Sequence, residues 1–148
     1  MARFEISHSI EIDRSAATVY RYVTDLSQVT AWRPSVSRIE YDEDAPFGVG
    51  TIWHEITTFL GRDIVAHQEI AAVDVDRGFT IKQDAGGFTG YATWTFTPSG
   101  DNNCVASLNF EGELSGWFAT LAAGLLTSQG KKRLTRDFAN LKANAESQ

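Results

Sequence analysis

A change of hydrophobic period near the end of the chain sets the fold. Over most of the length, polar and apolar residues alternate in short runs with the period of two that half-buried strands show. Residues 115–147 then switch to helical spacing and keep it. Many strands joined by short turns and followed by one long helix predict a curved antiparallel sheet that holds the helix against one face.

The individual elements follow from the same patterns. Residues 1–12 alternate as a strand, and the side-chain oxygen of Asp13 or Ser15 can cap a helix that begins directly after it. Helical spacing from Val19 to Leu26 and a stop at 32–34 predict two short helices. The other elements are expected at 35–42, 51–60, 63–74, 78–84, 88–98 and 103–114 (strands) and from about Ser115 to Ala145 (the closing helix). The prediction is an α+β fold with seven antiparallel strands, in a single domain spanning 1–148.

Composition excludes several classes of function. The chain has 148 residues, 43% of them hydrophobic, and its net charge of -6 argues against a nucleic-acid partner, because such proteins bind phosphates through clustered Lys and Arg. The single cysteine, Cys104, cannot form an internal disulfide. The N-terminus lacks the pattern of a signal peptide, and the longest apolar run, 114–126, is shorter than the ~20 residues of a membrane span. We therefore expect a cytoplasmic protein without a membrane span.

Both ends of the chain resemble one known superfamily. Residues 10–36, "IEIDRSAATVYRYVTDLSQVTAWRPSV", are similar to its opening strand and capped helix, and residues 133–147, "RLTRDFANLKANAES", are similar to its closing helix. This is the START-like or Bet v 1-like (SRPBCC) superfamily, and the closest resemblance is to its bacterial polyketide cyclase/dehydrase-like branch. The resemblance implies a helix-grip fold with a cavity. Members transport lipids, bind hormones or cyclise polyketides, so the resemblance carries over no catalytic residue.

The closing helix predicts where the cavity lies. Leu134, Phe138, Leu141 and Ala145 share one stripe at 100° per residue. If the helix is straight, as is usual in the superfamily, this stripe continues backwards onto small residues that include Ala123 and Thr127 and leave room above the sheet. If it bends near Gly124 or Gly130, the cavity shrinks. In the straight helix, which we favour, a second apolar stripe of Trp117, Leu121 and Leu125 needs cover from a loop, a ligand or a homodimer partner; in the bent helix this stripe can point inward as well. The basic group Lys131, Lys132, Arg133 and Arg136 is interpreted as a solvated face.

The strands supply the opposite wall of the cavity. Even positions from Phe88 to Phe96 and from Cys104 to Phe110 are apolar and should face the helix. Strands 51–60 and 63–74 have apolar residues on both faces; choosing the even faces places His54 and Gln68 inside, beside His8. The expected ligand contacts are His54, Gln68, Gln83, Tyr91, Trp94, Phe110, Phe118, Ala123 and Thr127.

Three hypotheses of function follow. The first is a carrier or sensor that buries a small hydrophobic ligand, such as a lipid, a polyketide or another polycyclic or acyl molecule, with no cofactor. The second is an enzyme similar to polyketide aromatase/cyclases, with His54, Tyr91 and His8 as candidate acid/base groups; His54 comes first, since an unperturbed His has a pKa of about 6.5. The three histidines have no metal-ligand spacing, so no metal site is expected. The third is a protein-interaction module that uses the Trp117 stripe.

Overall fold

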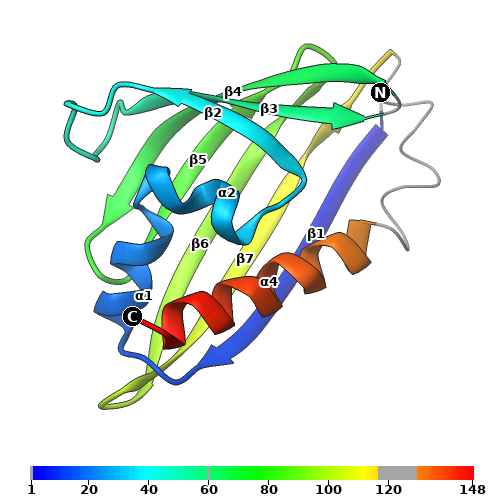
Figure 1. Ribbon diagram of the computed structural model, residues 1–148. Helices are drawn as coiled ribbons and strands as arrows, with labels where there is room; N and C mark the ends of the chain where they lie inside the picture. Colours follow the sequence, from blue (N-terminus) through cyan, green and yellow to red (C-terminus); the bar gives the residue numbers. More distant parts are fainter. Residues whose placement is uncertain (1, 60, 117–129) are drawn as a thin grey trace.

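One antiparallel sheet of seven strands forms the body of the chain. The structure is a computed structural model, and it describes residues 2–59, 61–116 and 130–148. Its strands are β1 (Ala2–Ile12), β2 (Val36–Tyr41), β3 (Ile52–Phe59), β4 (Arg62–Asp74), β5 (Gly78–Asp84), β6 (Phe88–Gly100) and β7 (Asn103–Leu114). The order across the sheet is β1-β7-β6-β5-β4-β3-β2, so β2 to β7 form a meander and β1 closes beside β7 (Figure 1). The predicted seven antiparallel strands are confirmed.

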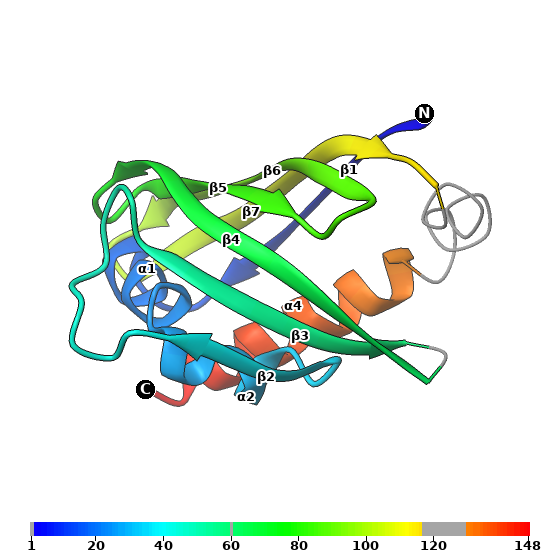
Figure 2. The same ribbon diagram turned by 90° about the horizontal axis from the view of Figure 1, so that it is seen from above.

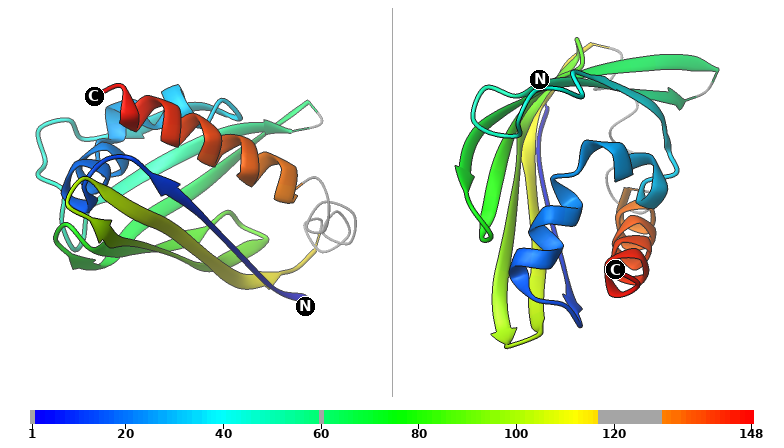
Figure 3. Two further views of the ribbon diagram at one scale, coloured as in Figure 1. Left: turned by 90° about the horizontal axis from the view of Figure 1, so that it is seen from below. Right: turned by 60° about the vertical axis from the view of Figure 1, so that its left-hand side comes forward.

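The helices of the described residues lie on the inner face of the curved sheet. Between β1 and β2 the chain forms α1 (Ala16–Val23), the short 3-10 helix η1 (Leu26–Gln28) and α2 (Val29–Trp32) at one end of the sheet (Figures 1 and 2). Ser15 caps α1, because its Oγ accepts a hydrogen bond from the Thr18 N–H. The long helix α4 (Gly130–Glu146) crosses the sheet, which curves around it (Figure 3). This is the expected helix-grip arrangement.

The C-terminal half of the closing helix packs as its period predicts. Phe138, Leu141 and Ala145 have no exposed surface, and Leu134 packs against the same core. The helix does not begin at Ser115, however, because the Ser115 N–H donates to the Gly87 carbonyl and Gly116 turns with a φ of 57°. Residues 117–129 lie outside the described residues, and with them the prediction of a straight or bent helix near Gly124.

The inner face of the central strands also follows the predicted alternation. Ala92, Trp94 and Phe96 of β6 are buried, and Cys104 and Ala106 of β7 are fully buried beside them. This face is the core wall, and the two strands run in register along it, with Phe96 opposite Ala106. The inward positions predicted from the even residues of these two strands are therefore confirmed.

The inward register predicted for β3 is wrong. Trp53 and Glu55, not His54, face the interior, where they are 3% and 5% exposed. The prediction is wrong because both faces of β3 carry apolar residues, so the alternation does not distinguish them. Burying the Glu55 carboxylate costs free energy unless both oxygens find partners. Here Glu55 Oε2 accepts a hydrogen bond from Trp53 Nε1 at 3.0 Å, and its other oxygen pairs with Arg33. On β4 the even face is inward as predicted, with Gln68 and Ile70 each 1% exposed.

Candidate functional site

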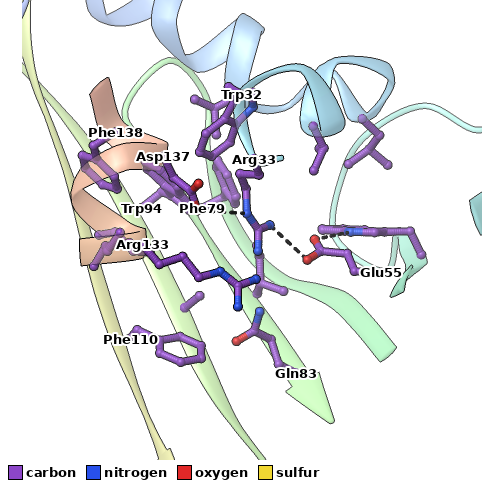
Figure 4. A pocket seen from close by; sticks show the side chains of 18 of the residues that line it. Trp32, Arg33, Glu55, Phe79, Gln83, Trp94, Phe110, Arg133, Asp137 and Phe138 are labelled. Atoms are coloured by element: carbon purple, nitrogen blue, oxygen red, sulfur yellow. Dashed lines mark hydrogen bonds and ion pairs between the residues drawn. The ribbon is translucent and has the colours of Figure 1, made fainter. Parts of the chain in front are cut away.

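A cavity of about 360 Å³ lies between the sheet, α2 and α4. Its lining divides into two groups of side chains that come from different elements (Figure 4). The aromatic group consists of Trp32, Phe47, Trp53, Phe79, Trp94, Phe110 and Phe138. The polar group consists of Arg33, Glu55, Gln83, Arg133 and Asp137. An apolar cavity with a few converging polar groups is the usual form of a small-molecule site.

The aromatic side chains pack against one another across the cavity. Trp94 of β6 stacks on Phe138 of α4, with ring centroids 5.3 Å apart and an angle of 9° between the planes. Trp32 meets Trp94 edge-on at 5.8 Å, and Phe79 of β5 stacks beside Trp94 at 6.3 Å. Trp94 is therefore at the centre of the aromatic group, in contact with Trp32 of α2, Phe79 of β5 and Phe138 of α4. This group suits a flat or elongated apolar ligand.

Arg33 links the two carboxylates of the polar group. Its guanidinium Nη1 donates to Glu55 Oε1 at 3.0 Å, and its Nε lies 4.0 Å from Asp137 Oδ2 (Figure 4). Glu55 thus has a partner for each of its oxygens, since Trp53 Nε1 donates to the second. The carboxylate side chains are only 7% exposed, so the pairing with Arg33 is what allows them to lie inside.

Arg133 lacks such a partner. It lies one helical turn before Asp137 on α4, and its guanidinium points into the cavity (Figure 4). Within the described residues it makes no hydrogen bond or ion pair. Burial, and next to it the positive charge of Arg33, lowers the pKa of Arg133 below its ordinary value. Burial raises the pKa of Asp137, although the nearby arginines act against this shift.

Gln83 adds an uncharged polar group to the same part of the cavity. It lies on β5, and its amide is drawn on the side of the cavity that Arg133 and Arg33 face (Figure 4). Its Oε1 is buried and has no hydrogen-bond partner among the described residues. Gln68 Oε1 is also buried without a hydrogen-bond partner among the described residues, but Gln68 is not among those that line the cavity. A buried amide oxygen without a partner is uncommon and marks a place where a ligand group can bind.

The predicted ligand contacts divide into three sets. His54, Gln68 and Tyr91 are not among the described residues that line the cavity. Gln83, Trp94 and Phe110 line the cavity, and their contact with a ligand stays a prediction. Phe118, Ala123 and Thr127 lie outside the described residues. So do Trp117, Leu121 and Leu125, on which the homodimer prediction depends.

The three candidate acid/base groups are not brought together. His54 lies on the outer face of the sheet, where its Nε2 is 3.2 Å from His67 Nδ1. Tyr91 is 44% exposed on the outer side of β6, opposite to Ala92 and Gly90. His8 does face inward, but it packs edge-on against Phe138 at 4.7 Å and is not among the described lining residues. The inward placement expected for His54 therefore fails together with the β3 register.

The charged residues of the cavity were missed at the level of the sequence. The solvated-face interpretation of the basic group is wrong for Arg133, although Lys131, Lys132 and Arg136 are exposed as expected. The helical period contained a signal: Arg133 and Asp137 are spaced by four residues and adjoin the buried stripe at Leu134 and Phe138. No comparable signal marked Glu55, whose position depends on the register of β3.

Two further findings concern metals and membranes. Among residues 2–59, 61–116 and 130–148, no group of three or more His, Cys, Asp or Glu side chains could hold a metal ion. None of the helices in the described part of the chain has both the length and the apolar character needed to cross a membrane.

Solved structures with the same fold come from several kinds of protein. The Zhui aromatase/cyclase from Streptomyces sp. R1128 has a TM-score of 0.78 at 12% identity, covering 98% of this chain and 94% of that chain. A START superfamily protein from Mycobacterium smegmatis has a TM-score of 0.75 at 13% identity, and the match covers 95% of this chain and 97% of that chain. Norcoclaurine synthase from Thalictrum flavum has a TM-score of 0.69 at 18% identity, and the match covers 95% of this chain and 92% of that chain. These identities are low, so the likeness shows the fold.

The sequence itself gives the family. No curated protein is a match for this chain. A family model described as polyketide cyclase / dehydrase and lipid transport does match it, over residues 3–146. This family supports the binding of hydrophobic ligands in general. Because the match extends over nearly the whole sequence, the chain belongs to the polyketide cyclase/dehydrase and lipid transport family.

Proposed function

We propose that residues 1–148 act as a single domain that binds one small, largely apolar molecule in the cavity, as a cytoplasmic carrier or sensor. The observation that carries this proposal is the cavity of about 360 Å³ with an aromatic wall and a polar group at one side. Its volume falls within the range of about 300–1,000 Å³ that ligand sites occupy. The lipid transport named in the family description supports the same function.

The arrangement of the aromatic rings indicates which class of ligand fits the cavity. Trp94 and Phe138 present nearly parallel rings, and Phe79 adds a third ring close to the plane of Trp94. A polycyclic or extended acyl molecule would remove the most apolar surface from water against such a wall. The polar group then orients the ligand, since Arg133 and Gln83 have polar atoms without a partner among the described residues and gain from one.

A cavity-filling substitution tests the carrier proposal. Ala92 lies on β6 in the cavity wall, whereas its neighbour Thr93 points to the outer face. We expect Ala92→Phe to weaken the binding of Nile red about tenfold or more, because the added ring occupies the ligand volume. Thr93→Phe is the matched control and should bind the dye as the wild type does. Equal dye binding by both variants, each with a normal melting temperature, would place the dye elsewhere and contradict the proposal.

The natural ligand can be sought directly. Extraction of the purified protein with organic solvent, followed by mass spectrometry, should recover a specific small molecule from the wild type. The same extraction from Ala92→Phe should yield much less of it. A lipid recovered in this way would support the carrier over the enzyme.

A second candidate function is an enzyme related to polyketide aromatase/cyclases. What favours it is the set of ionisable groups inside the cavity, with the pKa of Asp137 raised and that of Arg133 lowered by burial. On this hypothesis Asp137 is the group positioned to move protons, in place of His54. The test is turnover of poly-β-ketone analogues: activity in the wild type that is lost in Asp137→Asn, while Nile red still binds, would favour the enzyme.

A further inference from the structure

The two arginines of the cavity differ in what they contact. Arg33 is held by Glu55 at 3.0 Å and lies 4.0 Å from Asp137. Arg133 points into the same cavity, and among the described residues nothing hydrogen-bonds or pairs with its guanidinium. A charged group taken out of water needs a partner of opposite charge or a set of hydrogen bonds to offset the loss of hydration. Arg133 therefore has binding capacity that the described protein does not use.

We infer that the ligand carries a carboxylate, and that Arg133 binds this group while the aromatic wall holds an apolar body. The inference rests on the proposed function and names its ligand class, an amphipathic acid. A guanidinium presents parallel N–H donors in one plane, and this geometry matches the two oxygens of a carboxylate. A neutral hydroxyl or ester would leave the charge uncompensated.

The charged neighbours of Arg133 leave its positive charge without full compensation. Glu55 accepts from both Arg33 and Trp53, so its oxygens are already engaged. The lowered pKa of Arg133 shows that the attraction of Glu55 and Asp137 does not offset burial and the repulsion from Arg33. An added negative charge at the guanidinium would reverse this balance.

Gln83 can contribute a second donor to the same group. Figure 4 shows its amide across the cavity from Phe110, on the side where the Arg133 guanidinium ends. The amide nitrogen donates two hydrogen bonds, and one of them can reach an oxygen that Arg133 also binds. Arg133 and Gln83 would then hold the carboxylate at one end of the ligand, with Trp94 and Phe138 against its apolar part.

The experiment compares two probes that share one apolar body. We would measure the Kd of 1-pyrenebutyric acid and of 1-pyrenebutanol at pH 7 by quenching of the cavity tryptophans. The proteins are the wild type, Arg133→Met, Arg133→Lys and Lys132→Met. Lys132 is the matched control, since it is the exposed neighbour of Arg133 on α4 and its loss changes the net charge equally.

We expect the wild type to bind the acid about tenfold or more tightly than the alcohol, as a charge-assisted bidentate pair allows. Arg133→Met should reduce this ratio to about one while changing the Kd of the alcohol less than about threefold, because the Met side chain keeps the apolar stem of Arg. Arg133→Lys should retain part of the preference, and Lys132→Met should retain it all.

The outcomes separate the two proposals. Equal binding of acid and alcohol by the wild type would overturn the carboxylate inference and leave the carrier proposal standing. A loss of preference in Lys132→Met as large as in Arg133→Met would also overturn it, because overall charge would then explain the result. Failure of the wild type to bind either probe would overturn both. The wild-type ratio decides the question even if an Arg133 variant does not fold.

Discussion

The two ends of the cavity differ in how far their side chains satisfy one another. At the aromatic end, Trp94 stacks on Phe138 and meets Trp32 edge-on, so each ring is already in contact with another. At the polar end, Arg133 and the amide oxygen of Gln83 lack partners among the described residues. The aromatic contacts and the Arg33–Glu55 pair therefore contribute to the stability of the empty protein, whereas Arg133 and Gln83 keep polar atoms that a ligand can engage. Stability and selectivity can be varied separately in such a site.

The largest effect that tests this difference is expected at Phe138. Its side chain has no exposed surface and stacks on Trp94, so Phe138→Ala should lower the free energy of unfolding by about 3–5 kcal/mol. Urea denaturation measures the loss. Arg133→Met is the comparison from the polar end and should change stability by less than about 1 kcal/mol. If Phe138→Ala cost no more than Arg133→Met, the aromatic end would not be the structural one.

Arg33 should show an intermediate effect. Arg33→Met leaves the carboxylates of Glu55 and Asp137, each 7% exposed, without their cation. We expect a loss of about 1–3 kcal/mol, less than for a fully buried pair because the Arg33 side chain is 27% exposed. The double variant Arg33→Met/Glu55→Gln should recover part of the stability that Arg33→Met loses. A double-mutant cycle with Glu55→Gln gives the coupling energy, and a value near zero would show that the pair does not hold the polar end together.

The titration of Asp137 provides a finer test. Burial raises its pKa above the ordinary value of 3.8, while Arg33 and Arg133 lower it, so Arg33→Met should raise it further. Because the folded pKa is the higher one, the contribution of Asp137 to stability is complete below the unfolded pKa and is lost as the pH rises through the folded pKa. NMR of the carboxyl carbon measures the shift, and Asp137→Asn should remove this part of the pH dependence of unfolding. A pKa below 3.8 would mean that the arginines outweigh burial.

The smallest effect is expected on the outer face. His54 contacts His67 there, and neither is among the described lining residues. His54→Gln should change the Kd for Nile red less than about twofold, since shape and apolar area on the inner face determine binding. A tenfold loss measured by fluorescence titration would show that the outer face also influences the cavity.

The aromatic end could be predicted from the sequence because its residues repeat with the period of their element. Trp94 follows the alternation of β6, and Phe138 follows the helical stripe of α4. The polar end could not be predicted in this way. Glu55 can face inward because Arg33, 22 residues earlier in the chain, pairs with one of its oxygens and Trp53 Nε1 donates to the other. Arg133 belongs to a run of basic residues on a helix, and such a run is normally a solvated face. Both depend on tertiary contacts that a local pattern does not contain.

A pair of glycines beside Gln83 limits how this cavity can change during evolution. Gly90 pairs with Gln83 on one side and with Gly112 on the other, and Gly112 pairs in turn with Phe4. A Cβ atom on either glycine would overlap the backbone of the other strand, at Glu111 or Thr89, so neither position accepts a side chain. The stretch of sheet between Phe4 and Gln83, which adjoins the cavity at Gln83, therefore carries no side chain at these two positions and cannot be reshaped there by point substitution. Descendants of this protein that acquire a new ligand would have to change other lining positions, such as Gln83, Ala92 or Arg133, and leave these two codons untouched.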